Sequence, residues 1–388
     1  MNQFLHETVI VAYGRSPMGR AKKGSLAATH PVTLAAETLK GVLARVPSLR
    51  PEDIDDVLVG CAMTNGTQGG NLGRLVTMRA GLPDSVPAAT VNRYCSSGLQ
   101  TISMAANAIM AGQSDVVIAG GVESMSTTIM GASADTRDAW LSEHRPEAYL
   151  PMGITAENVA EQFGITRAEM DQMAEESHRK AHAAQASGAF EREIVPIHVD
   201  ALDGATFAMT QDEGIRPGTT VAALEQLKPC FKEGGVVTAA TSSQTSDGAA
   251  FVVMMSAEKA QQLKLTPIGR FLGFAVSGVP AEIMGIGPME VVPKLLERLQ
   301  IELKDMDVIE LNEAFAAQAI ACIRNLNLDL SKVNPRGGAM ALGHPMGATG
   351  AILTCRALSY LEDIGGRYGL ITMCIGGGMG AAGVVERL

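Results

Sequence analysis

The chain has 388 residues, of which 46% are hydrophobic and 19% charged, so it can bury the cores of two or three domain-sized units. Its 41 acidic and 31 basic residues give a net charge of −10, and no long run of Lys or Arg is available to follow a phosphate backbone. This balance argues against nucleic acid as a partner.

The cysteines and the apolar segments indicate a soluble, cytoplasmic chain without a metal knuckle or a redox dithiol. An early acidic residue, Glu7, interrupts the N-terminal apolar stretch, which therefore lacks the long apolar run of a secretory signal. Six glycines within 368–385 argue against a membrane helix there. The six cysteines form no close pairs, as expected of reduced thiols: Cys61, Cys95, Cys230, Cys322, Cys355 and Cys374.

Short β-branched runs alternate with helical patterns in the first third of the chain and again in the last third. This alternation is typical of α/β layers. The first third predicts a strand at 8–13, a helix at 34–46, a strand at 55–61, a helix at 98–112 and a strand at 115–121. The last third predicts a helix at 288–300, a strand entering a polar turn at 306–315, helices at 315–326 and 349–365, and a strand ending in glycines at 368–378.

The two thirds also resemble each other in their residue patterns, which suggests an internal duplication. Residues 34–61 parallel 291–313, and residues 114–125 parallel 367–380. Chance similarity between two ordinary α/β segments is the alternative. Between them, about residues 122 to 245 are rich in Met, Ser, Thr and charges with few strand signals. Such an excursion is a lid, a binding loop or an oligomer contact, or else a plain structural elaboration.

Cys95 stands where an extended run ends and an amphipathic helix begins. A thiol at a helix N-terminus is favoured as thiolate by the dipole and the free backbone N–H groups. The small residues that follow, Ser96, Ser97 and Gly98, would let a substrate carbonyl approach the sulfur. We expect Cys95 to be a nucleophile, against the alternative of an inert buried cysteine.

Two further segments are glycine-rich and carry reactive side chains. His344 lies in a loop with five glycines between Gly337 and Gly350, which lets the imidazole approach a ligand, so it is the candidate base. Cys374 ends the strand before Gly376, whose N–H could serve an oxyanion. A formal GxGxxG also begins at Gly378, but the chain stops soon after it, which excludes a dinucleotide-binding unit.

Polar residues at two other places could serve either a function or only the structure. Asn312 at a strand end could hold a water or donate to an enolate oxygen, or could cap a helix. His178 and His182 have metal-like spacing beside Glu175 but lack a third ligand, so we favour a solvated charged face and expect no metal.

Four segments together resemble the thiolase family, specifically the degradative 3-ketoacyl-CoA thiolases. They are VNRYCSSGLQTI, NEAFAAQ, GGAMALGHPMGATGA and CIGGGMGAA, in the order and spacing of that family, and the resemblance runs from about residue 6 to the C-terminus. It implies a five-layered αβαβα fold of two similar halves, residues 1–270 and 271–388, with the inserted loop domain at about 122–245 inside the first. It also implies a homodimer or homotetramer.

The resemblance further implies residue roles. Cys95 would become acylated, His344 would activate it, and Cys374 would exchange a proton with the acetyl methyl carbon. One oxyanion hole would lie at His344 and a water on Asn312, and the other at the N–H groups of Cys95 and Gly376. Residues matching the CoA and pantetheine tunnel are Met152, Arg216, Ser243, Ala314 and Phe315. This sequence departs from the family pattern at two places. One is the segment AYGRSP, and the other is Thr241, where the family commonly has an Asn.

This chemistry uses CoA as a substrate and requires no prosthetic group. A thiolate attacks the 3-keto carbon, and a second thiol with a near-neutral pKa protonates the departing enolate. We expect cleavage of 3-ketoacyl-CoA in fatty-acid β-oxidation, with a multifunctional β-oxidation subunit as a possible partner. The alternatives are a biosynthetic acetoacetyl-CoA thiolase, a Cys–His hydrolase, which would leave Cys374 without a role, and a non-catalytic CoA-binding protein.

Overall fold

The computed structural model describes residues 5–129, 136–200, 204 and 206–388. Strands are β1 Thr8–Arg15, β2 Gly19–Arg20, β3 Asp56–Gly60, β4 Ala88–Val91, β5 Val116–Ser124, β6 Ile197–Asp200, β7 Thr206–Met209, β8 Ser246–Ser256, β9 Gly269–Gly278, β10 Val308–Leu311, β11 Tyr368–Ile375 and β12 Met379–Arg387. Helices are α1 Pro31–Leu43, α2 Leu72–Ala80, α3 Ser97–Met110, α4 Ala139–His144, α5 Met152–Gln162, α6 Arg167–Ala186, α7 Val221–Leu224, α8 Ala257–Gln262, α9 Gly287–Leu299, α10 Ala316–Asn325, α11 Ala339–Leu342 and α12 Met346–Ile364.

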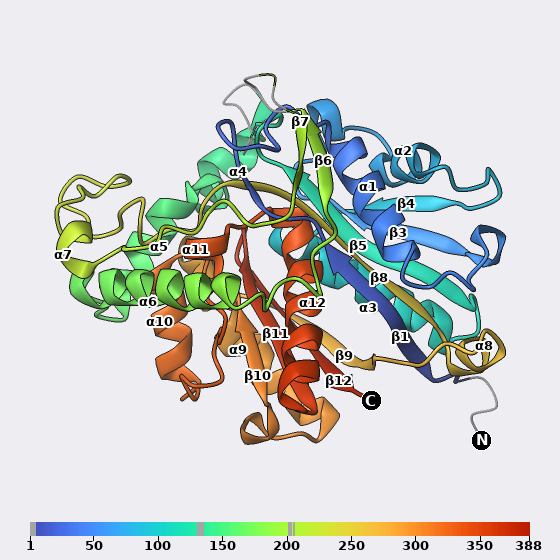
Figure 1. Ribbon diagram of the computed structural model, residues 1–388. Helices are drawn as coiled ribbons and strands as arrows, with labels where there is room; N and C mark the ends of the chain where they lie inside the picture. The colour runs from blue at the N-terminus through green and yellow to red at the C-terminus, as the bar shows by residue number, and fades with distance from the viewer. Residues whose placement is uncertain (1–4, 130–135, 201–203, 205) are drawn as a thin grey trace.

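The sheet order repeats itself, which confirms the prediction of two similar halves. The strands run β4-β3-β5-β8-β1 in the first half and β10-β11-β12-β9 in the second, and the halves join where Ile10 of β1 pairs with Gly269 of β9. Each half contains a parallel pair away from the junction, β3 with β5 in the first half and β10 with β11 in the second. In each half an antiparallel strand, β8 or β12, lies between that pair and the strand at the junction, β1 or β9 (Figure 1).

The same side-chain contact between neighbouring strands also recurs in both halves. Asp55 precedes β3 and its carboxylate accepts the N–H groups of Asp115 and Val116 at 2.7 and 2.9 Å. Asp307 precedes β10 and accepts those of Arg367 and Tyr368 at 2.6 and 3.0 Å. Because the matched carboxylates perform the same local task, the similarity between the thirds is a duplication and not a chance likeness.

Five layers follow from the two faces of each strand. In β8, Val252 and Met254 pack into the central cluster with α3 and α12, whereas the alternate residues Phe251 and Val253 pack outward against α1. The strands β10, β11 and β12 likewise face α12 on one side and α9 with α10 on the other. The order is therefore helix, sheet, helix, sheet, helix, as predicted.

The two central helices approach each other closely at glycines. A Cβ on Gly350 of α12 would lie 2.4 Å from the backbone nitrogen of Leu99 in α3, and one on Gly98 would lie 2.9 Å from the nitrogen of Ala351. Only glycine permits this contact between backbones. The contact brings the N-termini of α3 and α12, which follow Cys95 and His344, to the same end of the molecule.

The predicted excursion contains α4 to α7 and the β6-β7 hairpin. Figure 1 shows α5, α6 and α7 together on the left, where α5 contacts α10 and α6 contacts α10 and α11. The helices of the insertion are therefore packed on the C-terminal half, whereas the β6-β7 hairpin packs with α1 on the N-terminal half.

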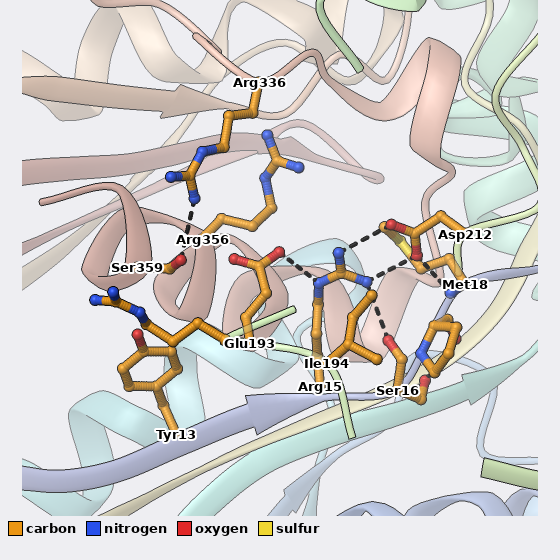
Figure 2. Close-up of polar contacts among 12 residues, drawn as sticks. Tyr13, Arg15, Ser16, Met18, Glu193, Ile194, Asp212, Arg336, Arg356 and Ser359 are labelled. Carbon is orange, nitrogen blue, oxygen red and sulfur yellow. Dashed lines mark hydrogen bonds and ion pairs between the residues drawn. The ribbon is translucent and has the colours of Figure 1, made fainter. Parts of the chain in front are cut away.

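Part of the insertion is held by a buried ion cluster around Arg15, the last residue of β1. Its guanidinium donates to Glu193 at 2.8 Å and to both oxygens of Asp212 at 2.8 and 2.9 Å, and all three side chains are fully buried (Figure 2). The neighbouring hydroxyl, Ser16 Oγ, accepts the Ala249 N–H at 3.0 Å. The AYGRSP segment is thus structural, which agrees with its lying outside the catalytic motifs.

The elements that were not predicted from the sequence include α2, β4, β8, β9 and β12. The glycines of the formal GxGxxG lie beside and within β12, which pairs antiparallel with β11. A strand, and not only a glycine-rich turn, therefore follows Gly378. These glycines serve packing, since a Cβ on Gly380 would lie 2.3 Å from the carbonyl carbon of Gly287 in α9.

Candidate active site

Cys95 lies in a constrained turn between β4 and α3. The preceding residue, Tyr94, has a φ of 43° in the left-handed region, which is unfavourable for a bulky side chain. Ser97 holds this turn, since its hydroxyl donates to the Tyr94 carbonyl at 2.7 Å and accepts the Arg93 N–H at 2.9 Å. The 3₁₀ turn Tyr94–Ser96 lies against α12 and β11, which carry the other predicted groups nearby.

His344 is buried immediately before α12. The bend that presents it depends on Gly343, whose φ is 112°, and on the His344 N–H, which donates to the Gln244 carbonyl at 3.0 Å. Its ring bridges two side chains, with Nδ1 2.6 Å from Thr349 Oγ1 and Nε2 3.4 Å from Asn312 Nδ2. The structure therefore brings His344 and Asn312 together as predicted.

These contacts define the tautomer of His344. The Thr349 hydroxyl donates its own proton to the Pro345 carbonyl at 3.0 Å, so its oxygen is left to accept from Nδ1. The neutral ring then carries its proton on Nδ1 and a lone pair on Nε2, which faces Asn312. Burial lowers the pKa of His344 to about 4, so the ring is neutral at physiological pH. His344 is thus built as a proton acceptor.

Asn312 is held at the end of β10, where its backbone N–H donates to Thr372 at 3.0 Å. It does not cap a helix, because α10 begins four residues later with Phe315 at its N-cap. Its side chain is buried, and no residue in the described part of the chain donates to Asn312 Oδ1. This free acceptor beside His344 could hold a water whose second proton is available to an oxyanion, a role that fits the site better than helix capping.

Cys374 is the penultimate, buried residue of β11, and Gly376 follows in the turn to β12. The Gly376 N–H is hydrogen-bonded to the Cys95 sulfur, where it opposes the rise in pKa of that thiol. The charge of Cys95 in turn raises the pKa of Cys374, so the two thiols lie within electrostatic reach of each other. The structure places both cysteines and Gly376 in one site.

The expected ionisation of the two thiols was wrong. Burial outweighs the helix N-terminus and raises the pKa of Cys95 to about 11, with a further contribution from Glu123. Burial likewise raises the pKa of Cys374 well above its usual value, and not toward neutrality. Both are therefore thiols at rest, and Cys95 needs a base such as His344 to react.

The residues predicted to line a CoA tunnel gather beside Cys374. Phe315 and Ala314 pack in one apolar cluster with Cys374, and Met152 contacts that cluster from the start of α5. The Met152 sulfur would lie 3.5 Å from a Cβ on Gly376, and the Ser243 N–H donates to the Ala314 carbonyl at 2.9 Å. This apolar wall could accept a pantetheine chain.

Arg216 lies on the surface of the insertion. Its backbone N–H donates to His178 Nδ1 at 3.1 Å, and its guanidinium has no hydrogen bond or ion pair with the residues that the structure describes. Burial and this arginine lower the pKa of His178 to about 4. His178 is thus a neutral hydrogen-bond acceptor buried on α6, whereas His182 is exposed. The two histidines therefore do not lie together on one solvated face, contrary to the expectation from the sequence.

Three side chains in the site were missed from the sequence: Glu123, Gln244 and Thr349. Gln244 donates to the carbonyls of Gly214 and Met340 at 2.8 and 2.9 Å and so joins the insertion to the His344 loop. The signal for Glu123 was available, because it is an acid on a face of β5 that is otherwise apolar and small. Thr349 follows His344 by only five residues at the start of the next helix, so the sequence also offered it as a partner for the imidazole.

Comparison with known proteins decides the family. The model named "Thiolase, N-terminal domain" matches residues 8–258, and "Thiolase, C-terminal domain" matches residues 265–387. The chain belongs to the thiolase family. It is 48% identical to a 3-ketoacyl-CoA thiolase of Bacillus subtilis (strain 168) over 98% of this chain and all of that one. It is 45% identical to the peroxisomal 3-ketoacyl-CoA thiolase A of Mus musculus over 97% of this chain and 90% of that one.

Solved thiolase-fold structures superpose on this thiolase over nearly its whole length. The acetyl-CoA acetyltransferase of Bacillus anthracis gives a TM-score of 0.93 at 39% identity, covering all of both chains. Human mitochondrial 3-ketoacyl-CoA thiolase gives 0.91 at 36% identity, covering 99% of this chain and all of that one. The Thr241 departure from the family pattern is accommodated locally, since Thr241 Oγ1 accepts the Thr238 N–H at 2.9 Å.

Proposed function

We propose that this thiolase is an acetyl-CoA C-acyltransferase that cleaves 3-ketoacyl-CoA with CoA to acetyl-CoA and a shortened acyl-CoA. The observation that carries the proposal is the convergence of Cys95, His344 and Cys374 from three separate segments on one site. A Cys–His hydrolase would use only the first two. The names of relatives at 44–48% identity support the degradative substrate.

The reaction proceeds in two half-reactions. His344 Nε2 takes the proton of the Cys95 thiol as the sulfur bonds to C3 of the substrate, and the adduct oxygen lies at an oxyanion site. The C2–C3 bond then breaks, its electron pair forms the enolate of acetyl-CoA, and the Cys374 thiol protonates C2. The CoA thiol then gives its proton to the Cys374 thiolate as its sulfur attacks the carbonyl carbon of acyl-Cys95, and the Cys95 sulfur leaves with the proton that His344 Nε2 returns.

The two oxyanion sites are separate. The backbone N–H groups of Cys95 and Gly376 would stabilise one, since both are directed toward the Cys95 sulfur and lower its pKa. The other would be stabilised by His344 once its Nε2 carries the Cys95 proton, and by a water on Asn312, and each site is worth about 3 kcal/mol of barrier. No prosthetic group or metal is needed, because the thioester already acidifies the methyl protons and CoA enters as a substrate.

CoA would approach over the insertion. We place its pantetheine chain along Met152, Ala314 and Phe315, near Ser243, and its phosphates near the free guanidinium of Arg216. A local cation suffices for this contact although the chain is acidic overall.

The second candidate function is biosynthetic condensation of two acetyl-CoA by the same residues. It is favoured by the likeness to the acetyl-CoA acetyltransferase of Bacillus anthracis. Acetyl-CoA release from 3-ketohexadecanoyl-CoA and from acetoacetyl-CoA, each with CoA, separates the two for wild type and Cys95→Ala. We expect CoA-dependent cleavage of the long substrate that disappears in the variant. Activity confined to acetoacetyl-CoA would favour the biosynthetic function, and no cleavage of either would refute both.

We further propose a cytoplasmic homodimer or homotetramer that can dock a multifunctional β-oxidation subunit. The half-buried edge strand β4 and the exposed side chains of Leu75 and Met78 on α2 and Met104 on α3 support self-association. Within the described residues no helix is long and apolar enough to cross a membrane. Sedimentation of wild type and of Met78→Asp tests this surface, with a lower mass expected for the variant.

A further inference from the structure

Glu123 is a fully buried acid with no cationic partner among the described residues. It is the penultimate residue of β5, on the strand face that otherwise packs Val117 and Ala119 into the central layer. A lone carboxylate is costly to bury unless N–H donors solvate it. Its partners therefore explain why it is tolerated there.

Four N–H groups surround the carboxylate, two on each oxygen. Oε1 accepts from Gln68 Nε2 at 2.6 Å and from the Met63 N–H at 3.1 Å. Oε2 accepts from the N–H groups of Ala62 at 2.9 Å and Gly347 at 2.8 Å. Burial raises the pKa of Glu123 and these donors oppose the rise. Since both oxygens face donors, the ionised carboxylate is the form that the surroundings fit.

The donors belong to the walls of the active site. Ala62 and Met63 follow β3 and pack with Met346 and Cys95. Gly347 lies in the first turn of α12, three residues after His344, where backbone N–H groups have no partner within the helix. One side chain thus joins the nucleophile's pocket to the helix that carries the base.

We propose that Glu123 is a positioning residue of the thiolase reaction. Its carboxylate fixes the N-terminus of α12 against the loop after β3, and its negative charge lies behind the pocket wall that Ala62 and Met63 form beside Cys95. The proposal rests on the proposed function insofar as Cys95 is its nucleophile. The titratable groups coupled to Cys95 are Glu123 and Cys374, His344 lies two residues before the helix that Glu123 holds at Gly347, and Cys61 lies beside Glu123 with its sulfur 3.8 Å from Oε1.

The experiment is the pH profile of Cys95 alkylation by iodoacetamide, followed on the Cys95 peptide by mass spectrometry. Glu123→Gln removes the charge, so we expect alkylation at pH 8 to become about 10-fold faster, as one pKa unit implies. We also expect kcat to fall with little change in KM, because the Gly347 N–H loses its anionic partner. Alkylation does not need turnover, so this test can fail while thiolysis by the wild type stands.

Two further variants guard against a general structural effect. Asp247→Asn removes another buried carboxylate, one strand away on β8, which accepts the Ser126 N–H at 2.9 Å, and it should leave the profile unchanged. Gln68→Met keeps the Glu123 charge but removes a donor, so alkylation should become slower than in the wild type. An unchanged profile in folded Glu123→Gln, the same shift in Asp247→Asn, or faster alkylation in Gln68→Met would overturn the proposal.

Discussion

Thr349 Oγ1 lies 2.6 Å from His344 Nδ1 and accepts its proton, so a hydroxyl does here what a carboxylate does in many Cys–His and Ser–His sites. The hydroxyl is locked by its own bond to the Pro345 carbonyl at 3.0 Å. A neutral acceptor fixes the tautomer without stabilising an imidazolium. This agrees with the low pKa of His344 and with a base that holds the proton only briefly.

Thr349→Val keeps the shape of the side chain but removes the acceptor, so the proton can move to Nε2 and block the base. We expect kcat to fall about 10- to 100-fold, part of the effect of general base catalysis, with KM nearly unchanged. Steady-state thiolysis measures both constants. Thr349→Ser is the matched control and should retain most of the activity; equal losses in the two variants would contradict the role assigned to the hydroxyl.

Cys374→Ser should separate acylation from proton transfer. Cys95 keeps its base and its oxyanion site, so an acyl-CoA should still acylate it in this variant. Exchange of the acetyl-CoA methyl protons with deuterated solvent should be lost, because a serine hydroxyl is a far weaker acid than a thiol. Proton NMR follows the exchange directly, and exchange at the wild-type rate would remove Cys374 from the mechanism.

The stability of the protein should fall as the pH is lowered from 6.5 toward 4, in part because of His178. Its pKa is about 4 in the folded protein and about 6.5 when unfolded, so the unfolded chain binds more protons in this window. His178→Asn keeps an acceptor near Nδ1 and should reduce the loss of urea midpoint between pH 7 and pH 5. His182→Asn, an exposed position on the same helix, should show the wild-type loss.

The alternation of strands and helices, the duplication and the insertion could be predicted because each depends on local pattern. Cys95, His344 and Cys374 stood out because glycine-rich or helix-initiating segments surround them. Strand β12 was missed since its glycines hide the alternation that marks a strand. The high pKa values of the thiols could not be predicted, because the burial that raises them is assembled from segments far apart in the chain.

For Glu123 the sequence shows the residue itself but not the groups that surround it. Its charge on a small, apolar strand face was visible in the sequence. Its donors were not, because they come from the loop after β3, from Gln68 and from Gly347, more than 200 residues away along the chain.

Arg15→Met should destabilise the fold by about 3–5 kcal/mol, because Glu193 and Asp212 would remain buried without their cation. The free energy of unfolding in urea, with circular dichroism as the probe, measures the change. Arg50→Met removes an exposed pair with Asp53 and should change the free energy of unfolding far less than Arg15→Met does. Similar losses in both variants would show that burial of the Arg15 cluster does not matter.

The central claim is that Cys95 carries the acyl group, and the intact mass of the protein tests it most directly. Wild-type enzyme mixed with 3-ketohexadecanoyl-CoA without free CoA and quenched in acid should gain one tetradecanoyl group on the Cys95 peptide, and added CoA should discharge it. Cys95→Ala should gain none. A wild-type enzyme that releases acetyl-CoA without acylation of Cys95, or that is acylated elsewhere in the chain, would contradict the account.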